Sequence, residues 1–390
     1  MSVEARTLAT SPSLLMPYRI LVAAGVFLLA MGAIVSPTRL WAALLWGGLA
    51  VLGIGVAALY FLAIHAVSGA AWATSFKRVP EAMTSLVPVG GLITLVAIAL
   101  GAARLYPALS VGGADSLPVF KQMWYSPAFY FARSVAYVGV LSAFAWGFRR
   151  ISRRQDEDRL IVHTFQGRRL SALFLILGSF VVVLSSIDWL MALEPMWYST
   201  IFGVYNFAGI FQSGLAALLL ILVWLKRRGV FDEEVNRDHI QDIAKFMFGM
   251  STFWMYIWYS QYVLIWYTNI PEETVYFTLR MTGSWLPLFF LNPVLNWVIP
   301  FHVLMARSPK RSLTIASRVA IVVLVGRALD LYLMIYPPLL EAGPRIGLAE
   351  VGALLAVVGL CALVLVRALK GASLVPVGDP LLEESLHHHQ

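Results

Sequence analysis

Long apolar stretches dominate this sequence and decide what it can fold into. Crossing the hydrocarbon layer of a membrane, roughly 30 Å thick, takes about 20 apolar residues in a helix. A membrane β-barrel would instead show short segments of alternating polarity, because only helices and closed barrels pair all their backbone groups in lipid. We predict an all-α polytopic membrane protein with about ten spans, at residues 18–35, 41–66, 84–106, 127–148, 169–190, 201–225, 242–267, 277–303, 314–336 and 347–369.

The polar connections between these spans are short, the longest being 147–168 and 107–127. We therefore predict one integral-membrane domain over residues 1–390, without an appended soluble domain. Within it, 41–190 and 201–336 are expected to form two four-helix bundles of the same orientation, flanked by the first and last spans. Residues 1–17 are predicted as a cytoplasmic segment without a signal-peptide pattern, and 371–390 as a cytoplasmic tail.

The distribution of basic residues explains the formal charge of +8. If both termini are cytoplasmic, 22 of the 29 Lys and Arg residues fall in inner segments and five in outer segments. The positive-inside rule predicts this asymmetry. The basic balance therefore indicates orientation and contact with anionic lipid, and no nucleic-acid partner is needed to explain it.

Few residues of this chain are suited to hold a metal or a redox centre. A single cysteine, Cys361, excludes intrachain disulfides, thiolate-held zinc and iron–sulfur clusters. His65 and His302 are the only histidines within the predicted spans, which allows at most one bis-His haem; hydrogen-bonded or solvated imidazoles are the simpler explanation. The run His387 to His389 is better explained as a solvated tail or an added tag than as a metal site. We expect no metal and no cofactor on this chain.

Ionisable residues inside the spans are the informative ones, because a charge near the bilayer centre costs at least about 2.5 kcal/mol. Arg327 and Asp330 lie three residues apart in the ninth span, on one helix face, which predicts a self-neutralising pair. Arg133, Asp188 and Glu350 lie toward the outer side and are expected to form a polar cluster there. An internal salt bridge without further function is the simpler interpretation of these groups.

The inner half contributes His65, Asp242, Asn296 and His302, with Gln212 deeper. If the two sets face a common interior, two half-paths meet near Arg327 and Gln212, as a proton relay requires. Hydrogen bonds between helices explain the amides equally well. The candidate proton path consists of Asp188, Arg133, Arg327, Asp330, Gln212, Asn296, His302, His65 and Asp242.

Two further groups are candidate contact surfaces. The seventh span is rich in aromatic residues, and a quinone headgroup could stack there, with Tyr259, Gln261 and Trp266 as contacts; an interfacial aromatic belt is the alternative. The carboxylates Glu194, Glu272 and Glu273 lie in predicted outer segments and are candidates for docking a partner. Asn269, Pro271 and the two glutamates also match a helix cap and first turn.

Two long motifs resemble a known family. They are Ser185 to Gly209 (SSIDWLMALEPMWYSTIFGVYNFAG) and Ser260 to Thr274 (SQYVLIWYTNIPEET), and residues 65–81, 296–311, 326–338 and 379–386 agree as well. The sequence resembles the NrfD-like (polysulfide-reductase-type) membrane subunits, and within them the ActF type of bacterial alternative complex III. The resemblance spans most of the chain.

This resemblance implies a role in quinol:cytochrome c oxidoreduction in the bacterial cell membrane. It implies haem c and iron–sulfur clusters on partner subunits, a sister NrfD-like subunit with the quinol site nearby, an iron–sulfur subunit, a multihaem cytochrome and small membrane subunits. The leading prediction is a membrane anchor that conducts protons, with no catalytic residue of its own. A secondary transporter that works without partners and a purely structural scaffold are the alternatives.

Overall fold

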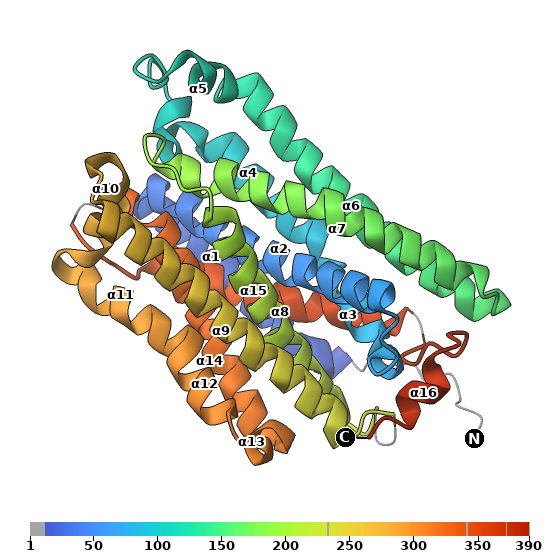
Figure 1. Ribbon diagram of the computed structural model, residues 1–390. Helices are drawn as coiled ribbons and strands as arrows, with labels where there is room; N and C mark the ends of the chain where they lie inside the picture. The colour runs from blue at the N-terminus through green and yellow to red at the C-terminus, as the bar shows by residue number, and fades with distance from the viewer. Residues whose placement is uncertain (1–11, 232–233, 341, 372, 390) are drawn as a thin grey trace.

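A computed structural model describes residues 12–231, 234–340, 342–371 and 373–389, and these residues form helices and connecting segments without a β-strand (Figure 1). Within this described part, eight helices are long and apolar enough to cross a membrane. They cover 13–35, 37–68, 74–105, 127–158, 162–193, 202–226, 283–304 and 348–370. The chain is therefore a polytopic helical membrane protein, and eight of the ten predicted spans are confirmed by length and composition.

The other two predicted spans correspond to long helices that carry more polar or charged residues than a membrane span usually does. Helix α9 (Arg237–Thr268) has 32 residues, but many of them are Trp, Tyr and polar residues. Helix α14 (Leu313–Ile335) has 23 residues and carries Arg318, Arg327 and Asp330. Both helices pack against α8 (Phe202–Lys226). In α9 the polar residues lower the mean hydropathy, whereas α14 is mainly apolar apart from its three charged residues.

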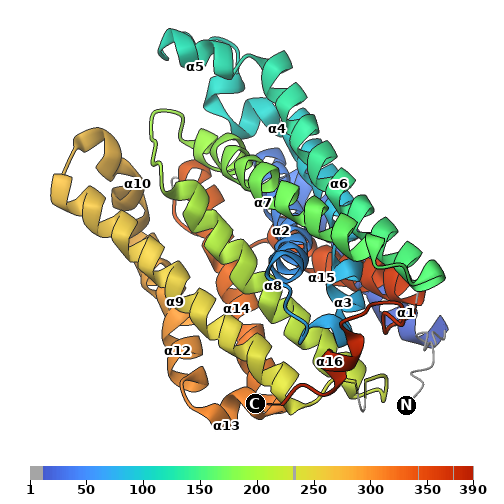
Figure 2. The same ribbon diagram turned by 45° about the vertical axis from the view of Figure 1, so that its right-hand side comes forward.

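The long helices run side by side between two ends of the molecule (Figures 1 and 2). One end, called the α10 end, holds the short helices α5 (Val119–Trp124) and α10 (Pro271–Met281). The opposite end, called the α16 end, holds α3 (Arg78–Met83), α13 (Arg307–Arg311) and α16 (Leu382–Leu386). Most basic residues assigned to inner segments belong to connections at the α16 end.

Packing divides the long helices into two groups that meet at α2. Helices α1 and α15 pack along each other and against α2. Helix α2 also contacts α7 and α8, so it joins the groups. The first group consists of α2 (Pro37–Ser68), α4 (Leu86–Leu105), α6 (Pro127–Asp158) and α7 (Val162–Trp189); the second consists of α8, α9, α14 and the interrupted helix α11 (Leu286–Pro293) to α12 (Ile299–Leu304); the flanking pair is α1 (Pro12–Val35) and α15 (Leu348–Lys370).

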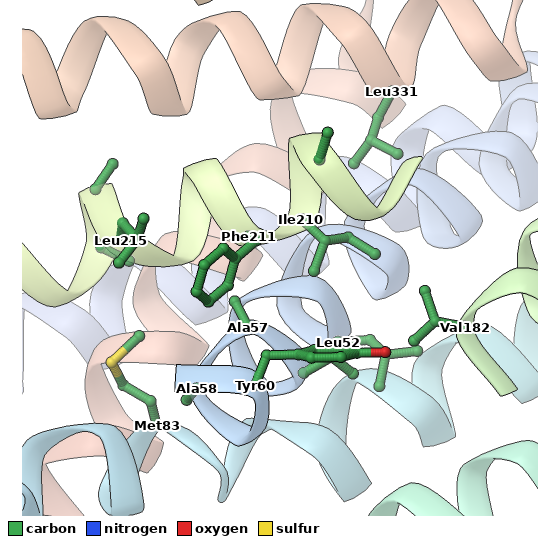
Figure 3. Close-up of a cluster of buried hydrophobic side chains, with 14 of the residues drawn as sticks. Leu52, Ala57, Ala58, Tyr60, Met83, Val182, Ile210, Phe211, Leu215 and Leu331 are labelled. Carbon is green, nitrogen blue, oxygen red and sulfur yellow. The ribbon is translucent and has the colours of Figure 1, made fainter. Parts of the chain in front are cut away.

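Small residues let α2 and α8 approach closely. A Cβ atom on Gly214 would lie 2.0 Å from the Cβ atom of Ala57, so only glycine fits there. Figure 3 shows the apolar layer around this contact, with Ala57 of α2 beside Phe211 of α8. The ring of Tyr60 on α2 lies 4.8 Å from that of Phe207 on α8. Beyond Ser213, the buried residues of α8 toward the α16 end are apolar. An apolar layer therefore lies between the middle of α8 and the α16 end.

The prediction of one continuous helix over 277–303 is wrong. Helix α10 ends at Met281, Gly283 adopts a left-handed backbone conformation (φ +57°), and a new helix starts at Leu286. Pro293 lacks a backbone N–H, and the next residues, Val294–Val298, form a π-helix before α12. Pro271 does begin α10, with Glu272 and Glu273 in its first turn, whereas Asn269 ends α9 in the left-handed conformation instead of capping the next helix.

The first helix begins earlier than predicted, and the tail folds back onto the α16 end. Of the predicted segment 1–17, residues 1–11 lie outside the described residues, and α1 already begins at Pro12. Residues 373–389 return to the α16 end of the molecule and place α16 against the segment after α2 (Figure 2).

Candidate functional site

The first buried ion pair joins α6 to α7 near the α10 end. The carboxylate of Asp188 is fully buried and accepts hydrogen bonds from Arg133 Nε and Nη2, both at 3.1 Å. Trp124 Nε1 donates to Oδ1 at 2.8 Å and the Tyr137 hydroxyl to Oδ2 at 2.9 Å. These four residues form what we call the Asp188 cluster. Both carboxylate oxygens are satisfied, so the buried charge is neutralised and well solvated by protein donors.

Aromatic rings hold the arginine of this cluster in place. The guanidinium of Arg133 lies 4.0 Å from the ring centre of Trp124 and 4.3 Å from that of Phe129. Its Nη1 also donates to the Trp124 carbonyl at 2.9 Å. In the loop beside this cluster, burial raises the pKa of Tyr125 to about 12, and the Asp188 charge adds to that effect, so the phenol stays protonated.

Glu350 does not belong to this cluster, contrary to the prediction. Its carboxylate accepts from Arg39 Nη2 at 2.5 Å and from the backbone N–H of Gly347 at 2.8 Å. It therefore ties the first turn of α15 to α2, on another side of the molecule. The prediction grouped Glu350 with Asp188 because both lie at a similar depth in their helices. In the structure the two residues face different neighbours.

The second buried ion pair lies within α14 and confirms the predicted self-neutralising pair. Arg327 Nη1 donates to Asp330 Oδ2 at 2.7 Å, and the Asp330 side chain is fully buried. The other oxygen, Oδ1, accepts from the Tyr205 hydroxyl and from Asn292 Nδ2, the latter at 3.0 Å. Arg327 Nη2 donates to Asn206 Oδ1 at 2.5 Å. The pair therefore receives partners from α8 and α11.

Amides extend this pair in two directions. Asn296 Nδ2 donates to Asn292 Oδ1 at 2.8 Å, and Gln212 Nε2 donates to the Asn296 carbonyl at 2.6 Å. On the other side, Asn206 Nδ2 donates to the Ser186 hydroxyl at 2.8 Å. We call this connected set the Asp330 network, and it consists of Ser186, Tyr205, Asn206, Gln212, Asn292, Asn296, Arg327 and Asp330.

Local backbone features make room for the Asp330 network. A Cβ atom on Gly209 would lie 2.5 Å from Arg327 Nη1, so the guanidinium occupies the space above a glycine of α8. A Cβ atom on Gly326 would lie 2.9 Å from the amide of Asn296. The π-helix Val294–Val298 contains Asn296. An extra residue in a helical turn is a frequent feature of functional sites, because it re-aims one side chain.

A small cavity lies between the Asp330 network and the first helix group. Its volume is about 20 Å³, which is enough for one water molecule. Ser185 and Trp189 of α7 line it from one side, and Asn206 and Arg327 from the other. Trp189 also donates from Nε1 to Ser134 on α6 at 3.0 Å. The two ion clusters are thus close neighbours across α7, and both lie in the half of the bundle toward the α10 end.

The predicted inner half-path does not join the Asp330 network through the contacts of the described residues. His302 is exposed, and its Nδ1 is 2.8 Å from the carbonyl of Val298 in its own helix. Asp242 bonds Lys245 at 3.0 Å and His388 at 2.7 Å, both at the α16 end. His65 is buried beside Phe61 and Trp72. Apolar residues around Ala57 and Leu215 lie between these residues and Gln212, and the meeting of the two half-paths stays a prediction.

His65 lines a cavity of its own at the α16 end. This cavity has a volume of about 80 Å³, and Lys77, Glu81, His163 and Asp379 also line it. Glu81 is buried, and its Oε1 has no hydrogen-bond partner among the described residues. Polar groups thus gather at both ends of the molecule, but with different partners.

The C-terminal tail packs onto the protein, so the predicted solvated histidine run is wrong for His388, whereas His387 and His389 are exposed. His388 Nε2 lies 2.7 Å from Asp242 Oδ2, and the His388 carbonyl accepts from Asn236 Nδ2 at 2.7 Å. The Ser385 hydroxyl donates to the Trp72 carbonyl at 2.8 Å, and Lys77 pairs with Asp379 at 2.9 Å. The tail therefore binds residues of both helix groups at the α16 end.

The predicted quinone contacts do not share one face. Gln261 is buried, and its Nε2 has no hydrogen-bond partner among the described residues. Tyr259 and Trp266, seven residues apart in α9, are both exposed on a face that does not include Gln261. A single wall made of these three residues is therefore not present on this chain.

The predicted docking carboxylates differ in their surroundings. Glu194 accepts from Arg280 Nη2 at 2.7 Å, and Arg280 is buried and also donates to the Leu333 carbonyl at 2.8 Å. Glu194 is therefore held inside the α10 end by an ion pair. Glu272 is exposed and Glu273 half-buried in the first turn of α10, where carboxylates favour the helix dipole.

Sequence reasoning missed several residues that complete the two clusters. Tyr205, Asn206 and Ser186 lie within the motif 185–209, and their position next to the ends of apolar helices is a signal that could have indicated them. Trp124 lies in a short helix outside the spans and gave no such signal. Among the described residues, no group of three or more His, Cys, Asp or Glu side chains could hold a metal ion.

Comparisons with known proteins identify no relative. No family model matches the sequence, and no curated protein shows significant similarity to it.

Proposed function

We propose that this chain is a membrane-anchor subunit of a quinol:cytochrome c type oxidoreductase, of the alternative complex III kind, and that its Asp330 network conducts protons. In this proposal the chain spans the membrane ten times with both termini cytoplasmic, as two four-helix bundles with α1 and α15 at their flank. The electron-carrying haem c and iron–sulfur centres belong to partner subunits. The sequence resemblance described above supports the complex and the partners.

The observation that carries the proton role is the hydrogen-bonded chain that runs from the fully buried carboxylate of Asp330 through Asn292 and Asn296 to Gln212. Asp330 is the one carboxylate of the Asp330 network, and its partner Arg327 lies in the same helix. Uncompensated burial of such groups is costly, and membrane proteins that carry them commonly use them for ion or proton movement. The Tyr205 hydroxyl and the Asn292 amide both donate to Asp330 Oδ1. These hydrogen bonds hold the carboxylate in position for a proton to bind and leave.

The test is Asp330→Asn in the assembled complex, reconstituted in sealed vesicles. Asparagine keeps the size of the side chain but cannot ionise. We expect quinol oxidation to continue while fewer protons are released per quinol, measured with a pH-sensitive dye. Glu272→Gln is the matched control, because it neutralises an exposed carboxylate at the same end. An unchanged proton ratio in an intact Asp330→Asn complex would contradict the proposed role.

A secondary transporter is the second candidate, because the helix α11–α12 is interrupted beside the buried charges. Discontinuous helices near buried polar sites are typical of transporters, and here Pro293 and the π-helix break the helix next to Asn292. A transporter works without partners. Purification of the native chain in mild detergent distinguishes the two: co-purifying multihaem and iron–sulfur subunits support the oxidoreductase, and solute transport by the isolated chain supports the transporter. If Asp330→Asn and Gln212→Leu change neither activity, the chain is a scaffold.

A further inference from the structure

An open pocket with arginine walls lies at the α16 end, apart from both ion clusters. Its volume is about 460 Å³, and it is enclosed by α3 and α4, by α6, and by the end of α15 with the segment that follows. Four arginines line it, namely Arg78, Arg149, Arg153 and Arg367. The one acidic lining residue is Glu81.

Among the described residues, the arginines of this pocket outnumber the carboxylates that pair with them. Arg78 is neutralised, because it pairs with Glu81 at 2.6 Å and with Asp156. Arg149 Nη1 donates to the hydroxyl of Ser85 at 2.6 Å and its Nε to the Ala145 carbonyl, and no carboxylate of the described part of the chain forms an ion pair with it. Among the described residues, neither Arg153 nor Arg367 forms an ion pair. Three arginine charges therefore face one space.

The arrangement of these charges favours a bound anion. Arg149 and Arg153 are four residues apart on α6, and like charges at that spacing repel each other. Both line the pocket together with Arg367 from α15, so a single anion placed between them would be attracted by all three. Guanidinium groups bind phosphate oxygens well, because their N–H donors match the spacing of those oxygens.

The position of the pocket indicates where the anion comes from. Helices α4, α6 and α15 are all long and apolar enough to span a membrane, and the arginines lie at their α16 ends. Val89 and Val364 line the deeper wall. From there, α4 continues with exposed Leu92 (62%) and Leu100 (65%), on the face that acyl chains would cover. Basic pockets between membrane helices at this level are typical sites for lipid headgroups.

We propose that this pocket binds the phosphate headgroup of an anionic phospholipid, with Arg149, Arg153 and Arg367 around the phosphate and the acyl chains along α4. The site is independent of proton conduction. It would anchor α15 to α6 through the lipid, because one phosphate contacts both helices.

The test uses the full-length chain in neutral detergent, with phosphatidylglycerol binding measured by native mass spectrometry against phosphatidylcholine. The pocket variant is Arg153→Gln/Arg367→Gln. Since each basic residue near an anionic lipid surface contributes about fivefold in affinity, we expect binding of phosphatidylglycerol to weaken about 30-fold. The matched control is Arg150→Gln/Arg154→Gln, which removes the same charge from α6 outside the pocket lining; its lipid binding is expected to stay nearly unchanged.

Two further variants keep the test decisive if the double variant does not fold. Arg153→Gln alone changes an exposed side chain and is expected to weaken binding about fivefold. Arg153→Lys/Arg367→Lys keeps the charges and is expected to retain most of the binding. Equal weakening in the pocket and control variants, or equal binding of both lipids, would overturn the proposal. Competition by glycerol phosphate at the same concentration as phosphatidylglycerol would overturn the lipid assignment in favour of a free phosphate ester.

Discussion

The two buried Arg–Asp pairs differ in what surrounds them, although both lie toward the α10 end. Asp188 is surrounded by a guanidinium, an indole and a phenol that saturate its two oxygens, and Arg133 lies between aromatic rings. Asp330 is bonded by one phenol and one amide besides its arginine, and further amides follow on both sides. The hydrogen bonds of the Asp188 cluster end at its own members, whereas those of the Asp330 network lead on to further amides.

This difference suggests two different tasks for the same pair of side chains. Indole and guanidinium groups donate but do not accept hydrogen bonds, so the Asp188 cluster cannot pass a hydrogen-bond chain onward through Trp124 or Arg133. Amides both donate and accept, so Asn292 and Asn296 can continue a chain from Asp330, whereas Asn206 is reached only through the guanidinium of Arg327. We therefore infer that the Asp188 cluster stabilises the join between α6 and α7, and that the Asp330 network serves function.

The largest expected effect is that of Asp188→Ala on stability. The change leaves Arg133 buried without its counter-charge and removes the acceptor of Trp124 and Tyr137. Breaking a buried pair by removing one partner costs about 3 to 5 kcal/mol. Chemical unfolding of the purified chain in detergent measures the loss, with Asp115→Ala in an exposed loop as the control. A loss below about 1 kcal/mol would remove the structural role of the Asp188 cluster.

A smaller effect is expected for Gly209→Ala, which changes the Asp330 network. The added methyl group would lie 2.5 Å from Arg327 Nη1 and 3.3 Å from Asp330 Oδ2, so the guanidinium must move. Overpacking of this kind costs about 1 to 3 kcal/mol, and we expect the proton yield per quinol to fall with it. Gly139→Ala on α6 is the control, because no atom lies within 4 Å of its added Cβ. If the melting temperature fell but the proton yield stayed the same, the position of Arg327 would not matter for proton conduction.

Hydropathy alone predicted much of this fold, and helix periodicity predicted the Arg327–Asp330 pair. Partners that are distant in sequence could not be predicted in the same way. Residues at similar depth were grouped as if they shared an interior, but depth does not give the face of the bundle on which a side chain lies. Glu350 therefore bonds Arg39 instead of joining Asp188.

The α16 end was the least predictable region for a related reason. Asp242 was assigned to the proton path from its place near a helix start, whereas its partner His388 lies 146 residues further on, in a tail that carries no apolar span. Backbone contacts such as the one from Ser385 to the Trp72 carbonyl depend on how the tail folds back, and no periodicity of the sequence encodes this. The contacts that polar residues make at helix ends therefore could not be predicted from their depth in the sequence alone.

The smallest effect is expected for His302→Ala, and it tests how far the relay of the second helix group extends. His302 is exposed and bonds only the Val298 carbonyl of its own helix among the described residues, so we expect neither the melting temperature nor the proton yield to change. Gln212→Leu is the positive control, because it removes the bond to the Asn296 carbonyl within the Asp330 network. If His302→Ala lowered the proton yield as Gln212→Leu does, protons would cross the apolar layer between them. The distinction between a closed and a continuing cluster would then no longer define the path.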